Sequence, residues 1–135
     1  MLQKRKDHAD HNYELCLHLH RRGGTSDWVI TIAFYACLHY ALAAIFPFTD
    51  GKRKGRPRYA DFEDYCLKRG IERGKHWETR RLVERKLSET LALKYNRLLD
   101  QSWTARYHEY RHSERAGQNA VNVLGAVRAE CGFGD

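Results

Sequence analysis

The chain has 135 residues, a length that fits one domain with a single hydrophobic core over residues 1–135. Hydrophobic residues make up 42% of the sequence and charged residues 30%, which excludes a disordered chain and is typical of a soluble globular protein. The net charge of +7 favours polyanionic partners such as RNA or nucleotides as much as it favours simple solubility.

The cysteines and the N-terminus indicate a reducing environment. The four cysteines lack a CxxC spacing, and Cys16 and Cys37 lie in apolar runs, where cysteine is usually a small buried hydrophobe. The first twelve residues contain no apolar segment of the kind found in signal peptides, so we expect a cytoplasmic protein.

Two long helices are predicted in the first third of the chain. The first covers residues 4–21 and ends at Gly23-Gly24, because paired glycines suit the C-terminal cap of a helix. The second begins at Trp28 and ends near Phe46, since Pro47 disfavours helical geometry in the residue before it. We expect this apolar segment to be a core helix rather than a membrane span. Its predicted buried stripe consists of Trp28, Ile32, Tyr35, His39, Leu42, Ala43 and Phe46.

A basic loop is predicted at residues 49–58, where two glycines and a proline disfavour regular structure. The loop could bind phosphates through Lys52, Arg53, Lys54 and Arg56. A short helix should follow over residues 59–69 and end at Gly70. Its predicted inward residues are Tyr59, Phe62, Tyr65 and Cys66.

Two further long helices are predicted, over residues 75–99 and from residue 101 to about 130, with a tight antiparallel junction at residues 100–102. The expected fold is therefore all-α, an up-and-down bundle of four long helices plus a short helix. The predicted inward face of the last helix consists of Trp103, Arg106, Tyr110, Ser113, Gly117, Val121 and Leu124.

Most of the groups that could perform chemistry lie in residues 101–115, QSWTARYHEYRHSER. One hypothesis for this segment is a zinc site, because His108, Glu109 and His112 match the HExxH pattern of zinc hydrolases. Arg111 would then place a cation beside the metal, and no later segment supplies an obvious third ligand. We therefore expect no metal and no other cofactor.

A second hypothesis comes from the order of three segments: DWVITIAFYACLHYALAAIF, then HWETR, then YNRLLDQSWTARYHEYRH. This order resembles the HEPN family of small all-α proteins, over a region from about Ala9 to His112. Its members show a tyrosine, leucine and serine ahead of an ARY triplet, as Tyr95, Leu98, Ser102 and residues 105–107 do here.

The resemblance implies metal-independent RNA cleavage, or nucleotide binding, by an Arg-x4-6-His motif that Arg106 and His112 match. Arg106 would neutralise the scissile phosphate, and His112 would transfer a proton. His108 and Tyr110 are alternative catalytic groups. His39 and Ser102 are candidate substrate-binding residues together with the basic loop. The family typically dimerises around one shared cleft, so a homodimer is expected.

Two alternatives to the ribonuclease remain open. The chain could be a non-catalytic binding module that partners a nucleotidyltransferase or another protein. The arginine could also have a purely structural role, in an ion pair between Arg106 and Asp100, Glu109 or Glu14, with His112 exposed to solvent.

Overall fold

A computed structural model of the chain describes residues 2–51, 55–107 and 113–134. Helices dominate these residues, which confirms the all-α class; the described part contains six helices and one two-stranded antiparallel sheet. The elements are α1 (Leu2–Arg22), α2 (Ser26–Ile45), β1 (Phe48–Thr49), β2 (Arg58–Tyr59), α3 (Phe62–Lys68), α4 (Lys75–Lys86), α5 (Glu89–Tyr107) and α6 (Glu114–Glu130).

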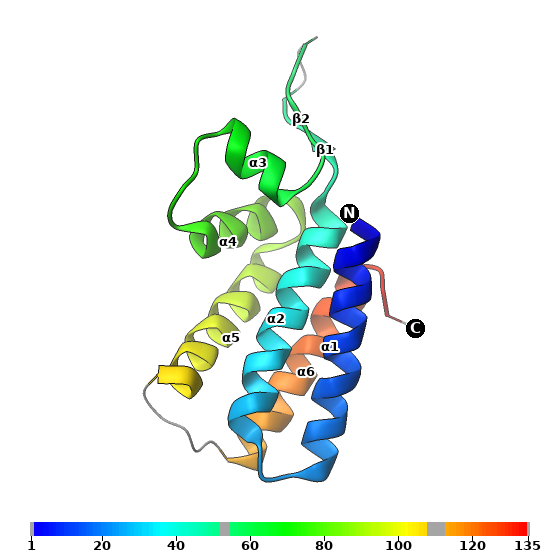
Figure 1. Cartoon of the computed structure of the whole chain (residues 1–135), viewed down its shortest axis with the longest axis vertical. Helices are drawn as coiled ribbons and strands as arrows, with labels where there is room; N and C mark the ends of the chain where they lie inside the picture. Colours follow the sequence, from blue (N-terminus) through cyan, green and yellow to red (C-terminus); the bar gives the residue numbers. More distant parts are fainter. Residues whose placement is uncertain (1, 52–54, 108–112, 135) are drawn as a thin grey trace.

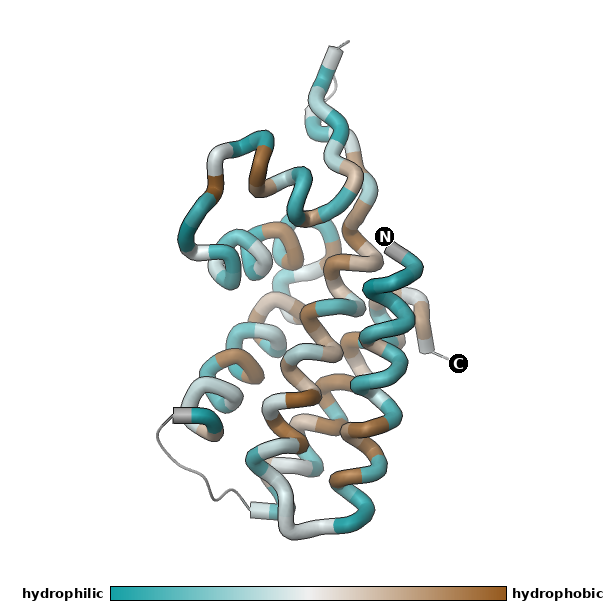
Figure 2. The backbone as a smooth tube through the Cα atoms, viewed as in Figure 1, coloured by the Kyte–Doolittle hydropathy of each residue, from teal (hydrophilic) through white to brown (hydrophobic). Residues whose placement is uncertain are grey.

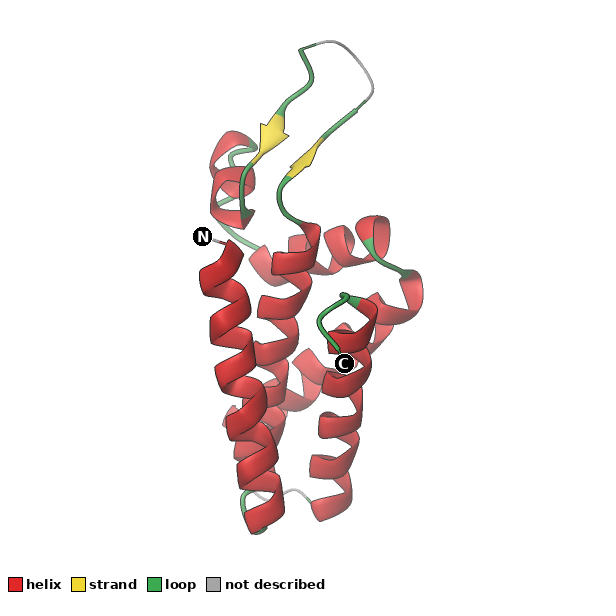
Figure 3. Ribbon diagram, turned by 90° about the vertical axis from the view of Figure 1, so that its right-hand side faces the viewer, coloured by secondary structure: helices red, strands yellow, loops and turns green. Residues whose placement is uncertain are grey.

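The four longest helices, α1, α2, α5 and α6, alternate in direction along the molecule (Figure 1). The hairpin, α3 and α4 are inserted between α2 and α5 and gather at one end of the bundle. Both ends of the chain lie on the side of the bundle away from α4 and α5. The two short strands pair with Phe48 opposite Tyr59, and the hairpin extends beyond the helices (Figure 3).

Helix α2 is the centre of the fold, because it packs against α1, α4, α5 and α6. Figure 2 shows long hydrophilic stretches on α1 and few on α2. By length and composition α2 could cross a membrane, but 61% of its apolar window is buried inside the protein, as in the core helix of a soluble fold. Its buried hydrophobic residues are Val29, Ile30, Ala33, Phe34, Ala36, Cys37, Tyr40, Ala41, Leu42 and Ile45.

The single buried stripe predicted for this helix is confirmed only at Leu42 and Phe46, which are buried. Trp28 is 60% exposed, and Ile32, Tyr35 and His39 are only partly buried. A helix that packs against neighbours on several sides is apolar all round, so a three- and four-residue spacing can be drawn through any of its sides. The predicted stripe followed a side that is less covered by the other helices.

The predicted ends of α1 and α2 are confirmed. Gly23 and Gly24 follow the last residue of α1 with φ of 79° and 77°, a conformation that glycine adopts without a Cβ clash. The Gly24 amide donates to Glu114 Oε1 at 2.8 Å, which fastens this turn to α6. Phe46 adopts the extended conformation expected of a residue before proline.

The helix predicted over residues 75–99 is broken at Leu87 and Ser88, where α4 ends and α5 begins. The Ser88 hydroxyl accepts a hydrogen bond from the Leu91 amide at 3.0 Å, as an N-cap does. Leucine and tyrosine residues at helical spacing predict the apolar side of this segment, and Leu82, Leu91, Tyr95 and Leu98 are buried while Leu87 and Leu99 are partly buried. The spacing of apolar residues continues from α4 into α5, so it gives no sign of the break at Leu87 and Ser88.

The helix predicted from residue 101 to 130 was also wrong. Helix α5 continues through residues 100–102, the predicted junction, and α6 begins only at Glu114. Its N-cap is Ser113, whose hydroxyl accepts from the Ala116 amide at 3.1 Å. Trp103, predicted to face inward, is 51% exposed, whereas Gly117 and Leu124 are buried as predicted.

The remaining local predictions hold with one correction. All four residues predicted to face inward around α3 are buried, and Gly70 follows the helix with a φ of 66°. Residues at both edges of the predicted loop pair as β1 and β2, so the segment is a hairpin rather than an unstructured loop. Cys16 and Cys37 are buried free thiols, and burial raises the pKa of Cys16 to about 12.

Replacing the two N-cap serines tests where the helices break. We expect Ser113→Ala and Ser88→Ala each to lower the free energy of unfolding by about 1 kcal/mol, because each removes a hydrogen bond to an otherwise unpaired helical amide. Urea unfolding followed by circular dichroism measures the change. Ser113→Asp, which retains an acceptor, is the matched control. If the helices were continuous, alanine would instead stabilise the protein by a few tenths of a kcal/mol.

Candidate functional site

Arg106 lies in the last turn of α5 and is partly buried against α2. Its Nη1 donates to the Tyr35 hydroxyl at 2.6 Å, and its Nε donates to the Ser102 carbonyl at 3.3 Å. The guanidinium carbon also lies 5.6 Å from the centroid of the Tyr35 ring. These contacts fix the direction of a side chain that otherwise has many rotamers, and they join α5 to α2.

A cavity of about 130 Å³ opens beside this guanidinium. Its lining combines a cation from Arg106, a hydroxyl from Thr31 and the exposed indole of Trp28, with Asp27 and Ala105 completing the wall. Pockets for whole organic ligands usually exceed about 300 Å³. The cavity therefore suits a group the size of a phosphate, with the rest of the ligand lying outside it.

Ser102 contributes to this site through its backbone. Its side chain is fully buried, and among the described residues its hydroxyl has no hydrogen-bond partner. Its carbonyl oxygen accepts the hydrogen bond from Arg106. Because the side chain is fully buried, the Ser102 hydroxyl does not reach a ligand at the surface.

The other proposed catalytic residues, His108, Tyr110 and His112, lie outside the described residues, as do Lys52, Arg53 and Lys54 of the basic loop. The HExxH hypothesis falls on the same undescribed segment and stays untested. Within residues 2–51, 55–107 and 113–134, no three potential ligands are close enough together to hold a metal ion.

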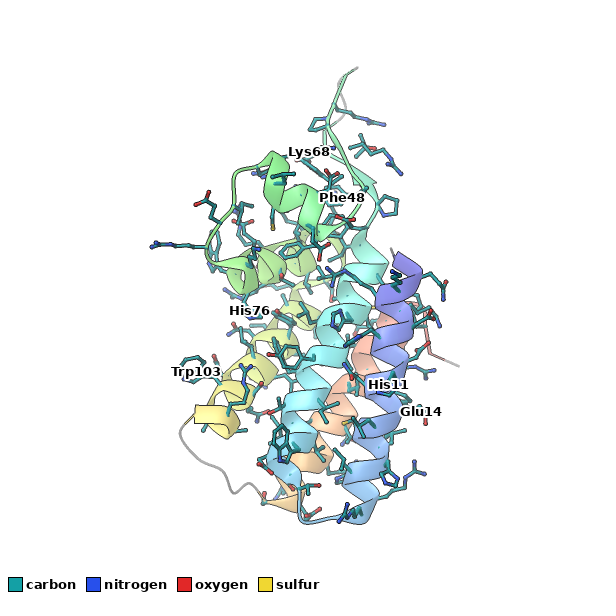
Figure 4. All side chains as sticks on the ribbon, viewed as in Figure 1. His11, Glu14, Phe48, Lys68, His76 and Trp103 are labelled. Carbon is teal, nitrogen blue, oxygen red and sulfur yellow. The ribbon has the colours of Figure 1, made fainter. Side chains whose placement is uncertain are left out.

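His76 at the start of α4 is a neighbour of Arg106 that the sequence did not single out. Its Nδ1 lies 3.3 Å from the Tyr95 hydroxyl, and its ring centroid lies 5.5 Å from that of Phe34. Burial lowers the pKa of His76, and the positive charge of Arg106 lowers it further. His76 and Trp103 project from the same side of the molecule (Figure 4). No spacing rule could pair residues 30 positions apart, so only the fold reveals this proximity.

His39 belongs to a different site, toward the other end of α2. Its Nδ1 lies 3.1 Å from Arg5 Nη1, and because a guanidinium only donates, this nitrogen must be the acceptor of a neutral imidazole. Arg5 also pairs with Glu63 at the start of α3. A cavity of about 240 Å³ is lined by Lys4, Arg5, His8, His39 and Glu63. His39 is therefore not brought together with Arg106.

Arg56 lies at a third location, in the hairpin. It is exposed, and its Nη1 donates to the Gly51 carbonyl at 2.9 Å. The hairpin projects from the end of the bundle opposite the last turn of α5, so Arg56 does not share the Arg106 cavity (Figure 1).

Comparison with known proteins adds no family assignment. No protein-family model matches the chain, and no curated protein matches it significantly.

The environment of His39 predicts a pH-dependent stability. Burial lowers the pKa of His39 to about 4, with smaller contributions from His8 and Arg5, whereas the unfolded value is 6.5. Between these values the unfolded chain binds more protons, so acidification from pH 7 to pH 4 destabilises the fold. After allowance for partial exposure, the contribution of His39 should be about 1–2 kcal/mol.

The control variant is His39→Asn, whose amide oxygen can accept the bond from Arg5 but does not titrate. As the pH falls from 7 to 4, the free energy of unfolding of the wild-type protein should decrease by about 1–2 kcal/mol relative to that of His39→Asn. Parallel stability curves across this range would contradict the assignment.

Proposed function

We propose that the chain is a HEPN-type endoribonuclease that cleaves RNA phosphodiesters without a metal, in a toxin or defence setting, and acts as a homodimer. The observation that supports this most is the Arg106 guanidinium, which Tyr35 orients beside a phosphate-sized cavity. A guanidinium cannot lose its charge near neutral pH, and it matches the geometry of phosphate oxygens. The dimer rests on the family resemblance.

The proposed reaction uses the ribose 2′-hydroxyl as the nucleophile. A bond forms between the 2′-oxygen and phosphorus while the bond from phosphorus to the 5′-oxygen of the next nucleotide breaks. One proton leaves the 2′-oxygen and one is delivered to the 5′-oxygen, so the products are a 2′,3′-cyclic phosphate and a free 5′-hydroxyl. Arg106 stabilises the extra negative charge on the phosphoryl oxygens in the transition state.

Two proton transfers require two groups, or one group used twice. In this proposal His112 performs one transfer, as the Arg-x4-6-His motif suggests. His108, Tyr110 and the nearby His76 are the candidates for the other. The imidazole of His76 fits the role of a base, since its lowered pKa favours the neutral form at neutral pH.

A non-catalytic binding module is the second candidate, and one observation favours it. Arg106 already donates to a hydroxyl and a carbonyl of its own chain, which is how an arginine with a structural role is satisfied. In that case the chain would bind a nucleotidyltransferase or another protein and leave RNA intact.

An RNA-cleavage assay in EDTA separates the candidates. We expect wild-type protein to cleave and Arg106→Ala to lose about 10²- to 10³-fold in rate, as when one transition-state donor is removed. Arg106→Lys should recover only part of the rate because lysine lacks the bidentate fork. Tyr35→Phe should lose about tenfold, the effect of one hydrogen bond to a charged group.

Arg97→Ala, an exposed arginine on the same helix, is the matched control and should cleave normally. RNA left intact by the wild-type protein would exclude the enzyme. Cleavage that EDTA abolishes would instead revive the zinc hypothesis.

A further inference from the structure

The positive charge of this protein is concentrated in residues 52–86, the segment of the hairpin, α3 and α4. It contains thirteen lysines and arginines against six acids, an excess of seven that equals the net charge of the whole chain. The remaining residues therefore contain equal numbers of basic and acidic side chains. A polyanion would be attracted to the end of the molecule where these elements gather (Figure 1).

Helix α4 presents an ordered part of this charge. Trp77, Arg81 and Arg85 recur at every fourth residue and so share one side of the helix; we call these three residues the α4 stripe. Trp77 is 56% exposed, and the side chains of Arg81 and Arg85 are 47% and 45% exposed. The helix is anchored to the core by Thr79, Leu82 and Val83, which are buried.

The tryptophan in the stripe is held in place by its neighbour. The guanidinium carbon of Arg81 lies 4.8 Å from the centroid of the Trp77 ring, a cation–π contact. More than half of the indole still faces solvent, so the ring is available to stack on a base. An exposed aromatic ring among cations is the combination on which single-stranded nucleic acid stacks its bases and neutralises its phosphates.

The acids near the stripe leave it positive. Asp50 is shared between two arginines: its Oδ1 lies 3.5 Å from Arg85 Nη2 and its Oδ2 lies 3.6 Å from Arg69 Nη1. Glu78 lies 3.7 Å from Arg81. Two carboxylates therefore face three guanidiniums, in partly exposed pairs that are weak in water. Phosphate groups can compete for these cations, and Arg69 extends the stripe toward the hairpin.

The stripe also begins close to the candidate catalytic site. Trp77 directly follows His76, whose ring lies 5.5 Å from that of Phe34; the Phe34 ring in turn lies 5.2 Å from that of Tyr35, the partner of Arg106. From Trp77 the α4 stripe runs along the helix to Arg85, which pairs with Asp50 beside strand β1 of the hairpin.

We propose that the α4 stripe, extended by Arg69, binds single-stranded RNA and guides the strand to Arg106. A base stacks on Trp77, and phosphates on either side bind the arginines. The choice of RNA rests on the proposed function, but the surface is separate from the cavity beside Arg106. Single-stranded RNA is the occupant we infer because it uses the cations and the exposed ring together, by phosphate binding and base stacking.

The test measures binding without cleavage. Fluorescence anisotropy of a fluorescein-labelled oligouridylate is followed in EDTA, with Arg106→Ala as the background in which cleavage is slow. Trp77→Ala should weaken binding by about 5- to 150-fold, the range for loss of one base stack, and Trp77→Phe should retain most of the affinity. Arg81→Glu with Arg85→Glu should also reduce the slope of log affinity against log salt by about 0.7 for each phosphate that the variant no longer neutralises.

Matched controls are available on neighbouring surfaces. Leu67→Ala removes an 81% exposed apolar side chain from α3, and Arg21→Glu with Arg22→Glu reverses two exposed charges at the far end of α1. Neither should change affinity by more than about twofold if the stripe is the site. Circular dichroism verifies that every variant is folded.

The outcomes separate this proposal from the proposed function. Either of two results would overturn the surface, whatever the cleavage assay shows. The first is that the wild-type protein has no detectable affinity for RNA. The second is that both Trp77→Ala and the double variant Arg81→Glu, Arg85→Glu bind RNA as tightly as the protein without these substitutions. If the stripe variants lose affinity while the wild-type protein cleaves nothing, the surface stands and the ribonuclease proposal fails.

Discussion

The structure depends on the burial of one helix that is apolar on nearly every side. α2 cannot be exposed to water along most of its length, so α1, α4, α5 and α6 must all pack against it. This requirement shapes the bundle around α2, and α1 and α6, at opposite ends of the sequence, also contact each other directly. It also explains why the hairpin and α3 are placed at one end, where α2 terminates.

The polar groups on the less covered side of α2 are matched by arginines from neighbouring helices. Tyr35 accepts a hydrogen bond from Arg106 of α5, and His39, one turn later, accepts one from Arg5 of α1. In each case a partly buried guanidinium donates to a neutral acceptor on α2 and lines a cavity, and Arg5 pairs with the Glu63 carboxylate as well. Two sites with similar construction therefore lie along one helix, and the resemblance to the HEPN family favours the one with Arg106.

Much of the fold could be predicted from local signals. Gly23-Gly24, Pro47 and Gly70 each end a helix for reasons that lie within the chain's own backbone, and those ends were predicted correctly. The breaks at Ser88 and Ser113 were missed because the apolar spacing continues across the first of them, and because Ser102 has the same capping chemistry as Ser113. A capping residue is recognised only when the helix is known to begin there.

The site was less accessible to prediction than the fold. Arg106 was predicted to lie on the inward side of its helix and is partly buried, but neither the expected phosphate nor the alternative carboxylate partners pointed to Tyr35, which is 71 residues away. His76 begins the HWETR segment, but nothing in that segment predicts its position beside Phe34 and Tyr95, which comes from the packing of α4 against α2 and α5. Long-range contacts of this kind depend on how helices pack, which spacing within a helix does not determine.

The central claim is that α2 holds Arg106 in position to bind a phosphate. The most direct measurement is an NMR titration of isotope-labelled protein with a 2′-deoxy dinucleotide, which keeps the phosphodiester but lacks the nucleophile and so cannot be cleaved. The claim predicts saturable shifts of the Arg106 Nε–H and of the Trp28 indole N–H at the rim of the same cavity. Resonances of both groups that remain unchanged while the protein is saturated with the dinucleotide would contradict it.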